Sequence, residues 1–191
     1  MKNSLKKITA LIAVALITIS CSKSDPAPEV PVPKPCVTTG TDFQNIFGTG
    51  GTNTYDFDVH SYEFKVNTNK TICKIGYQST VYNTSTPYTI KILQGTTVLY
   101  NQPHTFTSAA VSYITPSSAI SFVAGVTYTI ERIQTNSGPN NDQNIGNIKN
   151  ATFPLSFGDL TIIGSKFYFV SANGTSTLSN TKLPFIDIVF Q

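Results

Sequence analysis

Apolar and polar residues alternate along most of the chain after residue 60. Tyr62, Phe64 and Val66 fall on one side of such an alternation, with Glu63 and Lys65 on the other. A period of two is typical of a β-strand with one buried face, and it recurs in about ten short segments here. They are residues 60–67, 71–82, 88–92, 98–100, 111–113, 120–122, 126–130, 153–157, 160–170 and 185–190.

These segments predict an all-β fold. In the second segment, Cys73, Ile75, Tyr77 and Val81 would share the buried face. No helical period of useful length occurs after residue 21, and residues 37–58 are expected to be irregular with one short strand. About ten short strands joined by turns favour an antiparallel β-sandwich, jelly-roll-like in architecture.

The first twenty-one residues have a different pattern. Three lysines precede the uncharged apolar run 8–19, and Ser20 precedes Cys21. A basic segment, an apolar run and a small residue form the layout of an export signal. We therefore expect a signal peptide at residues 1–20 and lipidation of Cys21 as the new N-terminus. A plain signal peptide or a short membrane helix is the alternative.

A proline-rich segment follows the lipidation site. Five prolines lie between residues 26 and 35, which favours an extended spacer. A disordered tether is the alternative, with nearly the same role. The predicted organisation is a lipidated cysteine and linker at residues 21–35, followed by one β-sandwich domain at residues 36–191.

The net charge comes from the export signal. The chain carries 13 basic and 10 acidic residues, and removal of Lys2, Lys6 and Lys7 leaves ten of each. Nucleic-acid binding requires a clustered basic face, so a nucleic-acid partner is not expected. Charged residues make up 12% of the chain, about half the usual quarter. This composition is typical of an extracellular β domain.

Two cysteines remain if Cys21 is lipidated. Cys36 and Cys73 would then form a disulfide, since exported proteins fold in an oxidising compartment. The alternative is that Cys73 is a small buried residue between Ile72 and Ile75, with Cys36 a free thiol near the linker.

Two resemblances follow from these segments. Ser22-Lys23-Ser24-Asp25 resembles the tag that follows the lipidated cysteine in Bacteroidetes lipoproteins, which implies an outer-membrane anchor and surface exposure. The runs 62–66, 72–77, 88–93, 122–130 and 184–190 together resemble a bacterial surface domain family of unknown function. That family implies a β-sandwich with no assigned catalytic residues. The chain differs from the family in having no Trp.

Catalytic signatures are absent from the sequence. His60 and His104 lie in no metal or nucleophile motif, and two lone histidines are usually surface or turn residues. Glycoside hydrolysis needs two facing carboxylates, and no pairing of Glu63 with Glu131 follows from the sequence. We therefore expect a protein that is not an enzyme and needs no cofactor.

A structural calcium ion is the one metal the pattern suits. Asp56 and Asp58 lie on one side of an extended segment, and Asn140, Asn141 and Asp142 would add oxygen ligands. The alternative is that both aspartates form the polar half of an alternating strand.

Candidate ligand-binding residues lie at strand ends and in one long loop. Tyr82 and Tyr168 are placed to present a ring to solvent, and Arg132, the one arginine, would anchor an acidic group or cover a sheet edge. The loop of residues 135–150 is rich in asparagine and long for a strand connection. Its candidate residues are Asn140, Asn141 and Asp142.

Together these features predict a non-catalytic module anchored in the outer membrane. It would bind, or adhere to, glycan or another surface polymer through exposed tyrosines and polar loops. The alternative is a structural or assembly component of the envelope with protein partners only.

Overall fold

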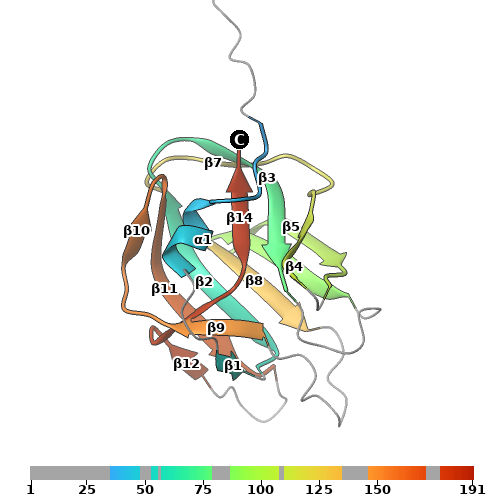
Figure 1. The fold of residues 1–191 in the computed structure, drawn as a ribbon, viewed down its shortest axis with the longest axis vertical. Coiled ribbons are helices and arrows are strands. Elements are labelled where there is room, and N and C mark those ends of the chain that lie inside the picture. Colours follow the sequence, from blue (N-terminus) through green and yellow to red (C-terminus); the bar gives the residue numbers. More distant parts are fainter. Residues whose placement is uncertain are drawn as a thin grey trace, which may run out of the picture. The chain divides into compact units, whose positions relative to one another are not determined.

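Two antiparallel β-sheets pack face to face in the computed structural model, and a third, small sheet lies beside them (Figure 1). The structure describes residues 35–47, 53–55, 57–78, 87–107, 110–134, 146–170 and 177–191. The predicted all-β antiparallel sandwich is confirmed. The described part contains fourteen strands, three of which were not predicted. Two of these, β12 Thr177–Ser179 and β13 Lys182–Pro184, are too short to produce an alternation in the sequence. The third, β9 Gly146–Asn150, forms the last part of the segment 135–150, so the prediction of a loop was wrong for these residues.

The large sheet has seven strands, in the order β10-β11-β2-β8-β4-β5, with β12 also paired to β11. Tyr62, Phe64 and Val66 of β2 are buried, and Glu63 between them is exposed, as the alternation predicted. The bounds are β2 Val59–Val66, β4 Tyr88–Gln94, β5 Thr97–His104, β8 Tyr128–Gln134, β10 Leu155–Phe157, β11 Leu160–Tyr168 and β12 Thr177–Ser179.

The facing sheet has four strands, in the order β14-β3-β6, with β7 also paired to β3. The small third sheet has the order β1-β9-β13. Their bounds are β3 Lys70–Tyr77, β6 Ser112–Ile114, β7 Ile120–Phe122 and β14 Asp187–Phe190, and β1 Asn53–Tyr55, β9 Gly146–Asn150 and β13 Lys182–Pro184. The single short strand expected within residues 37–58 is β1.

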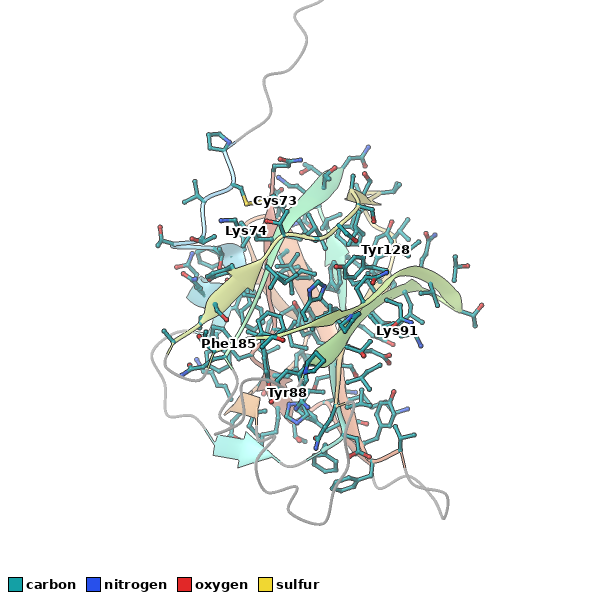
Figure 2. The ribbon with its side chains drawn as sticks, turned by 90° about the vertical axis from the view of Figure 1, so that its right-hand side faces the viewer. Cys73, Lys74, Tyr88, Lys91, Tyr128 and Phe185 are labelled. Carbon is teal, nitrogen blue, oxygen red and sulfur yellow. A yellow bond between two sulfur atoms is a disulfide. The ribbon has the colours of Figure 1, made fainter. Side chains whose placement is uncertain are left out.

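Aromatic side chains join the two main sheets. The Phe122 ring of β7 lies 4.5 Å from that of Tyr128 on β8 and 5.2 Å from that of Phe64 on β2. Tyr77 on β3 lies 5.4 Å from Tyr88 on β4 in an edge-to-face arrangement, and both Tyr88 and Tyr128 lie among the packed interior side chains (Figure 2). Such pairs stabilise a core beyond the area they bury.

A short helix, α1 Asp42–Phe47, replaces part of the segment that was expected to be irregular. Thr41 caps it, because its Oγ1 accepts the Gln44 backbone N–H at 3.1 Å, and Gln44 Oε1 accepts the Gly40 N–H at 2.8 Å. Phe43 and Phe47, one turn apart, are buried on the same face. The prediction was wrong because six residues are too few to show a helical period. Among the described residues, no helix has the length and apolarity needed to cross a bilayer.

The predicted disulfide between Cys36 and Cys73 is confirmed, with the two Cα atoms 5.9 Å apart. Figure 2 shows the bridge at Cys73, beside the N-terminal residues of the described part. One detail of the prediction was wrong. A β-bulge opposite Val189 and Phe190 resets the alternation of β3, so Ile72 rather than Cys73 is buried with Ile75. The bulge leaves Cys73 partly exposed, where it meets Cys36.

Candidate ligand-binding groove

The outer face of the large sheet carries polar side chains in cross-strand rows. The register pairs Lys166 with Ser61, Ser61 with Glu131, and Glu131 with Lys91. The neighbouring row runs from Gly164 through Glu63 and Thr129 to Leu93. Because successive residues alternate between the faces of a strand, both rows point away from the core. Glu63 and Glu131, far apart in the sequence, are thereby placed diagonally on adjacent strands.

A hollow of about 370 Å³ lies over these rows, and we call it the outer-face groove. Small residues keep its floor low. A Cβ at Gly164 would lie 2.7 Å from Asn180 Oδ1, so a larger residue there would displace the Asn180 side chain. The same Asn180 oxygen accepts the Ser165 N–H at 3.0 Å. The groove is lined by Ser61, Tyr62, Glu63, Leu93, Gly95, Thr129, Glu131, Gly164, Ser165, Lys166, Tyr168, Ser179 and Asn180.

Tyr168 is the aromatic residue at the end of the groove. Its side chain is partly buried, its hydroxyl donates to Glu131 Oε1 at 3.2 Å, and Lys166 Nζ lies 5.0 Å from its ring centroid. Burial, reinforced by the negative charge of Glu131, raises the pKa of Tyr168 to about 12. The phenol therefore stays neutral and keeps its proton for Glu131. The alternation had indicated a ring that projects into solvent. In the structure, Glu131 and Lys166 hold the Tyr168 ring in a fixed position.

The two glutamates of the groove differ in the hydrogen bonds and ion pairs that they make within the protein. Glu131 accepts from Tyr168, and its other oxygen lies 3.9 Å from Lys91 Nζ. The exposed Glu63 carboxylate, in contrast, makes no hydrogen bond or ion pair with any residue that the structure describes. It is the group of the groove that is open to an incoming donor. Lys166 is the one lysine of the lining, and Lys91, in the same cross-strand row but outside the lining, supplies the second positive charge against the two glutamates.

Arg132 lies in the interior and not on the surface. Its side chain is 0% exposed, and its guanidinium carbon lies 5.1 Å and 5.6 Å from the ring centroids of Tyr88 and Tyr77. The prediction of a surface anchor or an edge cover was wrong, because Arg132 falls in phase with Ile130 on the inward face of β8. The other candidates, Tyr82, Asn140, Asn141 and Asp142, lie outside the described residues, and their role stays a prediction.

Of the two predicted calcium ligands, the structure describes Asp58. Asp58 Oδ2 accepts the Val170 N–H at 2.7 Å, which ties the start of β2 to the end of β11. Asp56 lies outside the described residues. Within the described ranges, no group of three or more His, Cys, Asp or Glu side chains is placed to hold a metal ion. Calcium binding stays a prediction.

The two histidines pack against aromatic rings. His60 is fully buried, 4.9 Å from the Phe167 ring, so the expectation of a surface or turn residue was wrong for it. His104 is partly buried, stacks on Tyr100 at 5.7 Å, and accepts or donates a hydrogen bond at the Tyr100 hydroxyl. Burial lowers the pKa of His104.

Asp187 forms a buried polar cluster that the sequence did not predict. Its carboxylate is 0% exposed and accepts from Thr41 Oγ1 at 3.0 Å, Tyr113 OH at 2.8 Å and Gln44 Nε2 at 3.4 Å. Burial outweighs these donors and raises its pKa to about 6. The sequence feature that could have indicated this cluster is an acidic residue inside the otherwise apolar final strand. The cluster joins the cap of α1 to β14, and the Asp187 carboxylate at its centre is closed off from solvent.

The raised pKa of Asp187 predicts a pH-dependent stability. Because the fold prefers the protonated acid, its contribution is complete below the ordinary value of 3.8 and is lost as the pH rises through about 6. Relative to Asp187→Asn, wild type should lose about 2 kcal/mol of unfolding free energy between about pH 4 and pH 7. Urea denaturation across that range measures the difference. Glu63→Gln controls for general loss of negative charge, and parallel curves for wild type and Asp187→Asn would contradict the expectation.

No protein-family model matches the sequence, and no curated protein matches it either.

Proposed function

We propose that this protein is a lipid-anchored module of the cell envelope that binds neutral glycan through the outer-face groove and catalyses no reaction. The observation that carries the proposal is the groove itself. Its volume of about 370 Å³ falls within the range of small-ligand sites. An aromatic ring and an open carboxylate converge on it, and Lys166 and Lys91 of the same cross-strand row offset the two glutamates.

Each side of the groove suits one part of a sugar. The apolar face of a sugar ring stacks on an aromatic side chain, and Tyr168 supplies a ring whose position is fixed by Glu131 and Lys166. Sugar hydroxyls donate strong hydrogen bonds to a carboxylate, and Glu63 has that capacity open. Since lysine and glutamate charges cancel, a neutral polymer fits better than a strongly charged one.

The N-terminal pattern supports the location in this proposal. A basic segment, an apolar run and Cys21 fit export and acylation, and Ser22-Lys23-Ser24-Asp25 fits display at the outer face of the outer membrane. The disulfide between Cys36 and Cys73 suits an oxidising compartment. The proline-rich segment would tether the domain that carries the groove to the lipid.

We expect Tyr168→Ala and Glu63→Gln each to weaken glycan binding about tenfold, equivalent to the loss of one good contact. The measurement is retention on insoluble polysaccharides, followed by titration with the oligosaccharide retained best. Tyr168→Phe keeps the ring without the hydroxyl and should bind nearly as wild type. Thr161→Ala lies on the same sheet face outside the groove lining and serves as the matched control. Equal retention of all variants would refute the assignment of the groove.

A structural or assembly role with protein partners is the second candidate, and strand β5 favours it. This eight-residue strand forms an edge of the large sheet, carries no Asp, Glu, Lys or Arg, and in the described part pairs only with β4. Such an edge can add an extended strand from a partner. Copurification of envelope proteins without retention on any polymer would favour this candidate over glycan binding.

A further inference from the structure

One end of the sandwich is built from three strand turns that hydrogen-bond to each other. The turn of residues 67–69 lies between the other two. It accepts the Ala124 N–H at Asn69 Oδ1 (2.9 Å) and donates from Asn67 N to Asp159 O (2.9 Å). We call the turns of residues 67–69, 123–127 and 157–159, with the arm of residues 35–41, the tether-side tip. Figure 1 shows the C-terminus and the β10–β11 turn at this end of the body.

The N-terminal arm belongs to the same tip. Asp42, directly after the arm, accepts the Asp159 N–H at 3.1 Å. Pro35 and Val37 line a hollow of about 470 Å³ together with Gly158 and Asp159 of the β10–β11 turn. The chain that leads back to Cys21 therefore joins the body at this end, at Pro35.

Exposed apolar side chains collect at this tip. Val37, Val123 and Phe157 are 54%, 56% and 46% exposed, and they come from the arm and from two of the three turns. The described residues contain two further large apolar side chains of comparable exposure, Val98 and Val170. Val170 lies beyond the opposite end of β11, two residues after Tyr168.

The charge of the β10–β11 turn is paired. Lys70 Nζ lies 2.6 Å from Asp159 Oδ2, and Thr68 donates to the other Asp159 oxygen at 3.3 Å. A lipid headgroup layer that approaches this turn therefore meets a neutral pair rather than an isolated carboxylate. Side chains such as phenylalanine at the boundary of headgroups and acyl chains stabilise attachment in proportion to the apolar area they bury.

We infer that the tether-side tip rests on the lipid surface that holds the anchor, with Val123 and Phe157 in the interfacial layer. A short tether raises the local concentration of lipid at the tip to about the millimolar range, so a small apolar patch is sufficient. The inference rests on the lipid anchor of the proposed function. It adds an orientation: β11 leads away from the membrane over nine residues, about 30 Å, so the outer-face groove opens sideways above the lipid.

The absence of tryptophan from the chain allows a direct test. Phe157→Trp places a single fluorescent reporter at the tip, and Val170→Trp places one at the far end of β11 as the matched control. Each variant, as the chain from Cys21 to Gln191, is coupled through the Cys21 thiol to a maleimide lipid in phosphatidylethanolamine–phosphatidylglycerol vesicles. The other two cysteines are bridged, so Cys21 is the one thiol that reacts.

We expect coupling to shift the Phe157→Trp emission to shorter wavelength and to expose it to quenching by brominated phospholipid, while Val170→Trp stays unchanged. Equal responses of the two reporters, no response, or a response of Val170→Trp alone would overturn the inference. A shifted Phe157→Trp emission before coupling, with no further change afterwards, would indicate that protein covers the tip and would also overturn it. Chemical coupling replaces natural acylation, so mass spectrometry of the N-terminus in cells tests the anchor separately.

Discussion

Replacing Cys36 and Cys73 together by serine is expected to lower the free energy of unfolding by about 4 kcal/mol, the chain-entropy value for a loop of this length. The bridge spans 37 residues and connects the N-terminal arm to β3 at the bulge. Without it, the unfolded chain gains the freedom that the cross-link had removed. The arm and the following helix α1 would also lose their covalent link to the sandwich.

Urea denaturation of the double variant, under conditions that keep the wild-type bridge oxidised, measures this effect. Cys21→Ser is the matched control, because it removes the third cysteine without touching the bridge, and it should unfold as wild type. A double variant with the wild-type midpoint would show that packing alone fixes the arm. In that case the disulfide would have no part in stability.

The alternation of apolar residues was sufficient to predict an antiparallel sandwich and most of its strands. Tyr62, Phe64 and Val66 on β2, and Tyr128 and Ile130 on β8, face the core as their spacing indicates. One face of each of these strands is buried, and a strand with one buried face has an apolar residue at every second position. The disulfide could be predicted for another reason: assigning Cys21 to lipid left two cysteines.

Residues whose position depends on a distant partner could not be predicted in this way. The bulge at Cys73 follows from its pairing with β14, over a hundred residues later. The same holds for Asp187, whose burial depends on Thr41 and Tyr113 closing over it. Arg132 was misplaced because an arginine is rarely expected between two buried tyrosine rings.

The outer-face groove is the clearest case of such dependence. Glu63, Glu131 and Lys166 come from three strands, and only the register of those strands places them in one hollow. A single sequence contains Tyr168 as a candidate but not its neighbours. The lipidation of Cys21 and the roles of Tyr82 and of the asparagine-rich loop stay predictions.

Phe43→Ala is expected to destabilise the fold by about 3–5 kcal/mol, the usual cost of removing a fully buried phenylalanine. The Phe43 ring is 0% exposed and lies 5.4 Å from Phe185 and 5.8 Å from both Phe47 and Tyr62. It attaches the six-residue helix α1 to the core between the sheets. A helix this short has little stability of its own, so its position depends on that packing.

The loss of Phe43 should also reach Asp187, because Gln44 follows it directly and Thr41 caps the same helix. We therefore expect faster hydrogen exchange at α1 and at the Ile188 amide of β14, together with a lower urea midpoint. Ile46→Ala, on the same helix but only partly buried, is the matched control and should cost about 1 kcal/mol. If Phe43→Ala lowered the free energy of unfolding no more than Ile46→Ala does, the packing of α1 would contribute little to the stability of the core. The cluster around Asp187 would then form without that packing.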